Sequence, residues 1–127
     1  MATPTASELK AQVYLAFGDE RVCLDYTEAS TTTGFQGQVI GKELAASAAD
    51  QQVNLASYVD TATLIGVRDR NNTGVKVGIG ATNKFTLAAN GFIAFKNGDA
   101  TPPTLYLDNV SATDKAFVEI TILGTSA

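Results

Sequence analysis

The sequence predicts an all-β protein, and within that class a single antiparallel β-sandwich of about eight strands. Its apolar residues stand in short runs that alternate with polar residues, which is the period of a strand with one buried face. Groups of Gly, Asn, Asp and Thr interrupt these runs about every 8 to 12 residues, the spacing typical of sandwiches and barrels. The 127 residues are enough for one domain with its own core. Two long predicted loops favour a jelly roll. An immunoglobulin-like sandwich is the alternative, which the absence of Trp and of a cysteine pair weakens.

An arm and a hairpin are the first predicted elements. Residues 1–9 are small and polar and show no period, which predicts an extended N-terminal arm in front of a sandwich domain over 10–127. Residues 10–27 alternate on both sides of a Gly-Asp-Glu break, which predicts a hairpin. A stretch rich in Ser, Thr and Gly at 28–37 predicts the first long loop, and a short strand is expected at 38–40.

The segment 42–52 has two interpretations, a short helical turn or an irregular edge strand. Its alanines favour helix, but Leu44 is its only large apolar residue, which is too little for an amphipathic stripe. Strand signals are dense after it. A short strand at 52–55 and an apolar run at 62–69, able to be buried on both faces, precede a polar turn at 70–74.

A second hairpin is predicted around Asn90-Gly91, the strongest short hairpin signal in the chain, with strands near 85–87 and 92–95. Further strands are expected at 75–79, 104–108 and 115–123, and the second long loop at 96–103. The last strand alternates so regularly that we expect it to lie well inside a sheet.

The residue types needed for catalysis are scarce. The chain has no histidine, which excludes a Ser-His-Asp or Cys-His arrangement and the commonest zinc ligand. The acidic pair Asp19-Glu20 lies in a predicted turn, where carboxylates are normally solvated. Residues 69–74 resemble the first half of a calcium loop, but Gly80 stands where the twelfth position needs Glu, so a polar hairpin turn is favoured. The lone Cys23 is expected to be a small buried hydrophobe. We therefore expect no enzyme, no metal and no cofactor.

Charge and hydropathy exclude two classes of partner. Nine Lys and Arg against thirteen Asp and Glu give a net charge of -4, and the basic residues are spread along the chain. Nucleic-acid binding needs a clustered positive surface, so we expect none. No apolar run approaches the roughly 20 residues of a membrane span, and the start lacks the pattern of an export signal, so a soluble protein is expected.

The aromatic residues alternate with polar ones along the predicted strands. This spacing favours core positions over an exposed sugar-stacking platform for Phe85, Phe92, Phe95, Tyr106 and Phe117. Two of the tyrosines, Tyr58 and Tyr106, are the expected surface contacts.

Residues 63–123 resemble small jelly-roll structural proteins of tailed bacteriophages. The resemblance is carried by LIGVRD at 64–69, VKVGIG at 75–80, FTLAANG at 85–91, LYLD at 105–108 and VEI at 118–120. By size the best fit within that group is the capsid decoration, or cement, protein. The resemblance implies a homo-oligomer, trimer or dimer, made in the host cytoplasm and bound to the outside of the expanded head. There it would bridge subunits of the major capsid protein.

Two other functions stay open at this point: a phage tail or fibre component that presents loops to a receptor, and a carbohydrate-binding module. In all three cases the arm, the two long loops and one tyrosine are the expected contact surfaces. The candidate partner-interface residues are Thr3, Pro4, Thr5, Ser30, Thr31, Thr32, Phe35, Tyr58, Asn97, Asp99 and Pro102.

Overall fold

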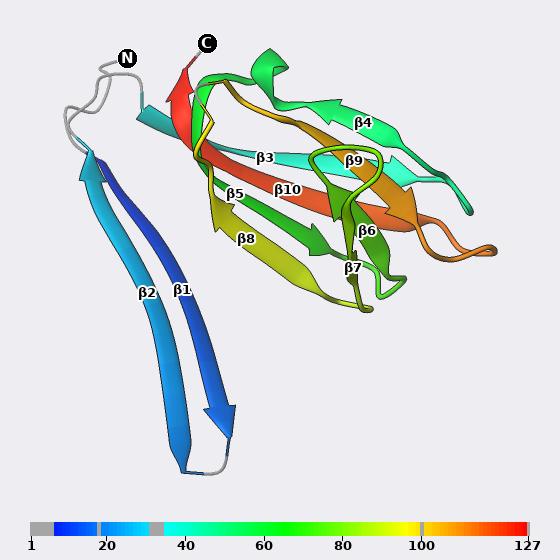
Figure 1. The fold of residues 1–127 in the computed structure, drawn as a ribbon, viewed down its shortest axis with the longest axis horizontal. Helices are drawn as coiled ribbons and strands as arrows, with labels where there is room; N and C mark the ends of the chain where they lie inside the picture. The colour runs from blue at the N-terminus through cyan, green and yellow to red at the C-terminus, as the bar shows by residue number, and fades with distance from the viewer. Residues whose placement is uncertain (1–6, 18, 31–34, 100, 127) are drawn as a thin grey trace. The chain divides into compact units, whose positions relative to one another are not determined.

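A computed structural model describes residues 7–17, 19–30, 35–99 and 101–126. The described residues are in strands, turns and one short 3-10 helix, which confirms the all-β prediction (Figure 1). They form two compact units, residues 1–35 and 36–127.

The first unit is a β-hairpin. β1 (Ser7–Phe17) pairs antiparallel with β2 (Glu20–Ser30), from Phe17 opposite Glu20 to Ser7 opposite Ser30. The predicted hairpin is confirmed and is longer than expected, so the predicted arm loses its last residues to β1, and residues 1–6 lie outside the described part. The hairpin is a two-stranded sheet of its own, whereas we expected it within the sandwich. Alternation predicts that two strands pair, but it does not predict which sheet they join.

Eight strands and one 3-10 helix follow. They are β3 (Phe35–Leu44), β4 (Gln51–Asn54), η1 (Leu55–Ser57), β5 (Val59–Asp69), β6 (Val75–Gly78), β7 (Lys84–Leu87), β8 (Phe92–Lys96), β9 (Thr104–Asn109) and β10 (Ala116–Ser126). The loop predicted at 28–37 is therefore wrong at both ends, because β2 continues to Ser30 and β3 begins at Phe35. Residues 31–34 lie outside the described part.

These strands form two four-stranded sheets with the jelly-roll order. The first sheet is β3-β10-β5-β8 and the second is β4-β9-β6-β7, so that every connection except β6 to β7 crosses between sheets. This order confirms the jelly roll and excludes the immunoglobulin-like alternative. The predicted position of the last strand is also confirmed, since β10 lies between β3 and β5.

The turn at Asn90-Gly91 does not close a hairpin, so that prediction is wrong. β7 pairs with β6, while β8 pairs with β5 in the other sheet. The backbone N–H of Asn90 donates to the carboxylate of Asp69 (3.1 Å), and the N–H of Asp69 donates to Gly91 O (2.9 Å). These bonds hold the turn against the end of β5, and the chain therefore crosses to the first sheet.

The segment 42–52, which had two interpretations, contains two edge strands joined by a turn. β3 runs to Leu44, the chain turns through Ser47 and Asp50, both with positive φ, and β4 begins at Gln51. One apolar side chain, Leu44, is buried here, too few to pack a helix and enough to anchor the end of a strand.

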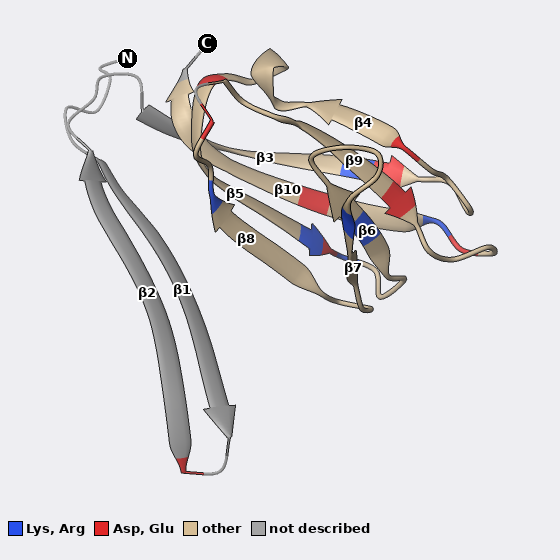
Figure 2. Cartoon of the chain, viewed as in Figure 1, with Lys and Arg blue, Asp and Glu red and all other residues tan. Residues whose placement is uncertain are grey.

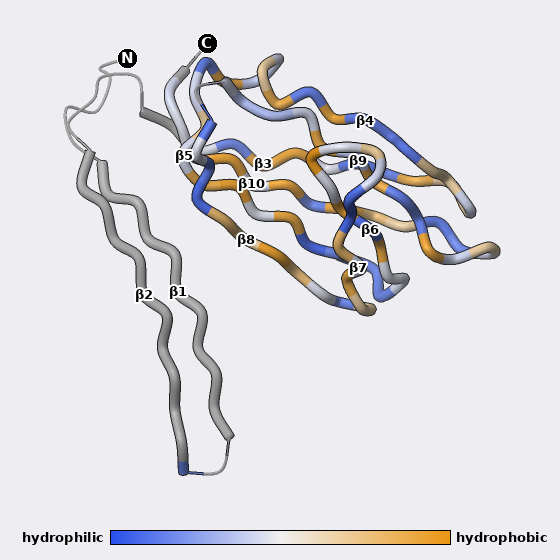
Figure 3. The backbone as a smooth tube through the Cα atoms, viewed as in Figure 1, coloured by the Kyte–Doolittle hydropathy of each residue, from blue (hydrophilic) through white to orange (hydrophobic). Residues whose placement is uncertain are grey.

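The core lies between the two sheets. Alternate residues of the central strands are fully buried, among them Leu105 and Leu107 of β9 and Val118, Ile120 and Ile122 of β10. Figure 3 shows the resulting alternation of apolar and polar residues along β10. In the described part of the chain, no helix is long and apolar enough to span a bilayer.

Candidate protein-binding surfaces

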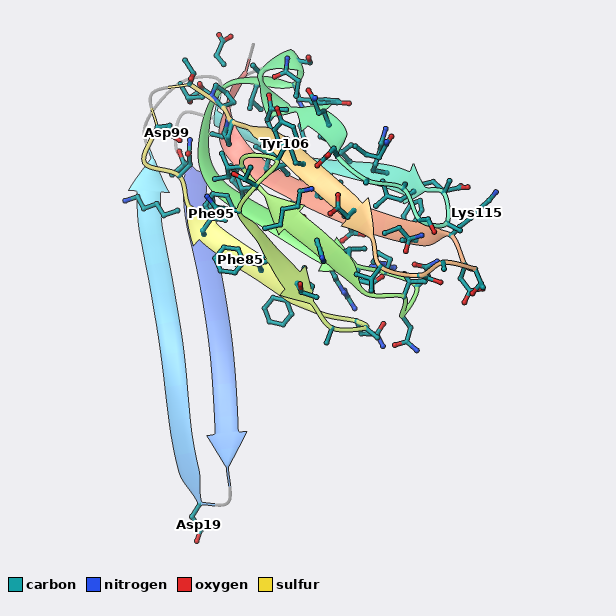
Figure 4. The ribbon with its side chains drawn as sticks, turned by 45° about the vertical axis from the view of Figure 1, so that its right-hand side comes forward. Asp19, Phe85, Phe95, Asp99, Tyr106 and Lys115 are labelled. Atoms are coloured by element: carbon teal, nitrogen blue, oxygen red, sulfur yellow. The ribbon has the colours of Figure 1, made fainter. Side chains whose placement is uncertain are left out.

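An apolar groove of about 370 Å³ opens between the edge strands β7 and β8, where the two sheets come apart. We call it the edge groove. Its lining is apolar except for one amide side chain and consists of Val77, Gly78, Ile79, Asn83, Phe85, Ile93, Ala94, Phe95 and Leu105. Figure 4 shows Phe85 and Phe95 from the two facing sheets on this side of the sandwich.

Large apolar side chains at the edge groove are in contact with solvent. Phe85 is 66% exposed and Ile79 is 51% exposed. Phe92 of β8, which is 61% exposed, lies opposite the exposed Arg68 on the outer face of the first sheet and not in the groove. Phe85 lies opposite the buried Val77 in the β6–β7 ladder, so it points toward the core side but has no strand beyond it. The predicted core role is therefore wrong for Phe85 and Phe92. Alternation predicts the face of a residue, but not whether its strand lies at the edge of a sheet.

The other aromatic residues have mixed positions. Phe95 and Tyr106 are half-buried, and Phe95 packs against the core cluster. Phe117 is 41% exposed on the outer face of β10, where its ring lies over Gly41. A Cβ built on Gly41 would be 2.7 Å from this ring, so glycine is needed for the contact. The core prediction therefore holds in part for Phe95 and is wrong for Phe117.

The predicted contact residues of the second half of the chain meet at one end of the sandwich. Tyr58 follows η1, and the loop after β8 lies beside it, since Leu55 N donates to Pro103 O (3.3 Å). Tyr58 is 38% exposed and Asp99 is exposed. Both side chains are therefore available to a partner. We call this end of the sandwich the loop end.

Two of the predicted contact residues support the loop end from within. The amide of Asn97 donates to Ala62 O (3.0 Å) and to Asp99 O (3.3 Å), so its side chain holds the loop against β5. Pro102 is buried, and its prediction as a contact residue is wrong. A proline ring has no donor to satisfy, and packing it inside the loop is favourable.

The other seven predicted contact residues fall outside the described residues or the described side chains. Thr3, Pro4, Thr5, Thr31 and Thr32 lie outside the described residues. Ser30 ends β2 and Phe35 begins β3, so both are strand residues where a loop was expected, and their side chains lie outside the described ones.

At the opposite end, Asp69 organises the turn that resembled a calcium loop. Asp69 is 1% exposed. Its carboxylate accepts five hydrogen bonds, from the backbone N–H groups of Gly74 (2.7 Å), Thr73 (3.0 Å), Asn90 (3.1 Å) and Asn71 (3.3 Å) and from the Thr73 hydroxyl (3.2 Å). Burial alone would raise the pKa of Asp69, but these hydrogen bonds have the larger effect. The pKa of Asp69 is therefore below its usual value. The carboxylate is satisfied by the chain itself, which agrees with a polar turn.

Asn109 ties two further turns to the same end. Its buried amide donates to Asp114 O (2.7 Å) and Ala45 O (3.0 Å), while its Oδ1 accepts from Ser111 N (2.9 Å). One side chain therefore joins the β3–β4 turn to the β9–β10 loop. No feature of the local sequence predicted this role, because Ala45 lies 64 positions before Asn109 in the chain.

An ion-pair cluster lies on the second sheet. Lys84 of β7 donates to both carboxylate oxygens of Asp108 of β9 (2.8 and 3.0 Å) and to Asp50. The hydrogen bonds that Lys84 donates to Asp108 and, next in size, to Asp50 raise the pKa of Lys84. Partial burial raises the pKa of Asp108, but the bonds from Lys84 and from Asp50 N outweigh it and lower that pKa. Figure 2 shows blue and red segments close together where β6, β7 and β9 lie.

Within the described ranges, no three His, Cys, Asp or Glu residues are close enough together to hold a metal ion. The acidic groups that meet a cation or a cluster of donors, among them Asp69 and Asp108, have their partners within the chain. What the described surface offers to another molecule is therefore apolar contact at the edge groove and polar or aromatic contact at the loop end.

Known proteins resemble this chain only in the arrangement of their strands. No protein-family model matches the sequence, and no curated protein matches it. A de novo designed double-stranded β-helix solved by NMR is similar over 68% of this chain and 96% of its own, with 16% identity and a TM-score of 0.46. The cupin domain of Schizosaccharomyces pombe Cnp3 is similar over 94% of this chain and 84% of its own, with 8% identity and a TM-score of 0.45. The fold assignment rests on the strand order.

Proposed function

We propose that the protein is a non-catalytic structural subunit of a tailed-phage particle, a decoration protein that binds the outside of the expanded head and bridges major capsid subunits. The observation that best supports a role in assembly is the exposure of apolar side chains at the edge groove. More than half of each of Phe85 and Ile79 is exposed around an apolar cleft. Grouped apolar residues on a small domain mark a surface that another protein covers.

A partner of another chemical class fits the groove less well. A sugar needs hydrogen-bonding groups beside the aromatic rings, and the groove supplies only the amide of Asn83 among apolar residues. Nucleic acid needs clustered positive charge, and the chain carries a net charge of -4. Protein surfaces remain the best match.

The loop end supplies the contact with the head in this proposal. Tyr58 and Asp99 are exposed there, on a base that Asn97 holds against β5. A partly exposed tyrosine on a rigid base is a favourable interface anchor, because little conformational entropy is lost when it is covered. The phage setting is supported by the strand pattern of residues 63–123 together with the jelly-roll order.

Reconstitution on undecorated expanded heads tests the proposal. We expect saturable binding at a fixed ratio to the major capsid protein, measured by co-sedimentation, and an added layer of density by electron cryomicroscopy. Tyr58→Ala should weaken binding about tenfold. Val110→Ala, which removes a 51% exposed apolar side chain at the opposite end, should leave binding unchanged. Heads that take up no protein at saturating concentration would contradict the proposal.

A further inference from the structure

We infer that the edge groove is covered by a second copy of this chain, through antiparallel pairing of β8 with β8 about a two-fold axis at Ala94. The two first sheets would then join into one continuous sheet. The inference rests on the proposed assembly role of the groove, but not on a phage head as its setting. Self-association and head binding are therefore measured separately.

The β5–β8 ladder shows which backbone groups of β8 point to the open edge. Asn97 N donates to Thr63 O (2.8 Å), and Asp69 N donates to Gly91 O (2.9 Å). In an antiparallel pair the hydrogen-bonded residues alternate, so the odd-numbered residues 91 to 97 bond toward β5. The N–H and C=O groups of Phe92 and Ala94 consequently point away from β5, to the edge where the sheet ends.

The edge has only one of the devices that normally prevent strand pairing, a lysine at its end. β8 has no proline and no bulge, and its one charged residue, Lys96, is its last. Figure 2 shows the rest of β8 without charge, and Figure 3 shows it as mainly hydrophobic. A strand of this kind is a template for another strand.

Two copies of β8 are complementary to each other in one register. With the axis at Ala94, the two Ala94 residues exchange both backbone hydrogen bonds, and each Phe92 lies opposite Lys96 of the other copy. The ring can pack on the aliphatic stem of the lysine and attract its ammonium group. The two Lys96 residues are four positions apart along the ladder, about 14 Å at 3.4 Å per residue, which exceeds the screening length in physiological salt.

The same register covers the apolar residues of the groove. On the core side, Ile93 of each copy lies opposite Phe95 of the other, and both residues line the groove. Phe85 and Ile79 line the same groove from the second sheet, so the pairing brings a second copy of the apolar lining next to them. The pairing thus covers large apolar side chains of the groove that are exposed in the monomer.

A proline at position 94 separates pairing from folding. The N–H of Ala94 points to the open edge, so Ala94→Pro removes a bond of the dimer and none of the β5–β8 ladder. The matched control Ala94→Ser keeps the N–H. Sedimentation equilibrium between about 1 µM and 1 mM should show a dimer for the wild type and for Ala94→Ser, and a monomer for Ala94→Pro. A wild type that stays monomeric over this range would overturn the inference, as would a dimer that Ala94→Pro leaves intact.

Cysteine cross-linking tests the register without relying on the proline variant. In a Cys23→Ser background, Ala94→Cys places two sulfurs across the axis at a Cα separation of about 5.5 Å, within disulfide range. Phe92→Cys places its two copies about 14 Å apart. We expect rapid cross-linking at position 94 and none at position 92, and the reverse result would refute the register. If Phe85→Ser abolished head binding while the wild type stayed monomeric, the capsid would be the occupant and the second copy would be excluded.

Discussion

The buried carboxylate of Asp69 is the most informative single position for stability. Asp69→Asn keeps the size of the side chain but replaces one oxygen by an amide group that donates. One oxygen accepts from Thr73 N, Gly74 N and Asn90 N, and the other accepts from Asn71 N and the Thr73 hydroxyl. The less costly orientation of the new amide keeps the first set and leaves Asn71 N without its acceptor.

The cost of this change follows from the bonds. Three retained bonds lose the charge of their acceptor, at about 0.5 to 1 kcal/mol each, and one donor loses its partner at about 1 kcal/mol. The easier desolvation of a neutral amide offsets part of this cost. We expect Asp69→Asn to lower the free energy of unfolding by about 3 kcal/mol at pH 7, equivalent to roughly 10 °C in Tm.

Urea unfolding followed by circular dichroism measures the difference, with Asp60→Asn on the exposed part of β5 as the control. The pKa of Asp69 is lowered in the folded state, so its contribution is present above the unfolded pKa of about 3.9 and is lost as the pH falls through the folded value. The gap between wild type and Asp69→Asn should be constant from about pH 5 to 8 and shrink below about pH 4. A gap under about 0.5 kcal/mol at pH 7, or one that widens on acidification, would refute the reasoning.

Three further predictions concern other parts of the sandwich. Asn109→Asp turns a donor to backbone carbonyls into a second acceptor, and we expect a loss of at least about 3 kcal/mol by urea unfolding; a loss below 1 kcal/mol would show that the amide does not tie these turns together. Lys84→Met removes the cation that lowers the Asp108 pKa, so an NMR titration should find that pKa higher than in the wild type, and an unchanged value would contradict the ion pair. Gly124→Ala puts a Cβ against the backbone carbonyl of Thr61 in β5 and should lower the free energy of unfolding by more than about 2 kcal/mol. Gly80→Ala, with open space around it, should change little, and equal effects would argue against the close approach.

The sequence predicted those parts of the fold that depend on local pattern. The period of two located the hairpin and the final strand, an apolar run located the strand at 62–69, and the spacing of turns predicted a sandwich or barrel, within which the long loops favoured a jelly roll. The regular alternation of Val118, Ile120 and Ile122 also predicted an interior strand, which β10 is. These features follow from which side chains face inward, and a sequence carries that information directly.

The predictions that were wrong concern features that depend on which strands become neighbours. Asn90-Gly91 reverses the chain in any fold, but only Asp69, 21 residues earlier in the chain, decides that the turn crosses between sheets. Phe85 has the spacing of a core residue, and its exposure comes from the place of β7 at the end of a sheet. The candidate surface was predicted at loops, where polar residues gather, while the apolar edge groove was missed because its residues have the pattern of a core.

Hydrogen bonds fix the base of the loop between β9 and β10. Asn109 bonds to Asp114 O across the base, and Ser111 N and O are both held, by Asn109 Oδ1 and Ser47 N. The exposed tip, Ala112 and Thr113, therefore protrudes from a ring that the protein has already fixed. Lengthening such a tip costs little closure entropy. This position, at the end opposite Tyr58, is therefore the best place in the sandwich to insert a foreign peptide.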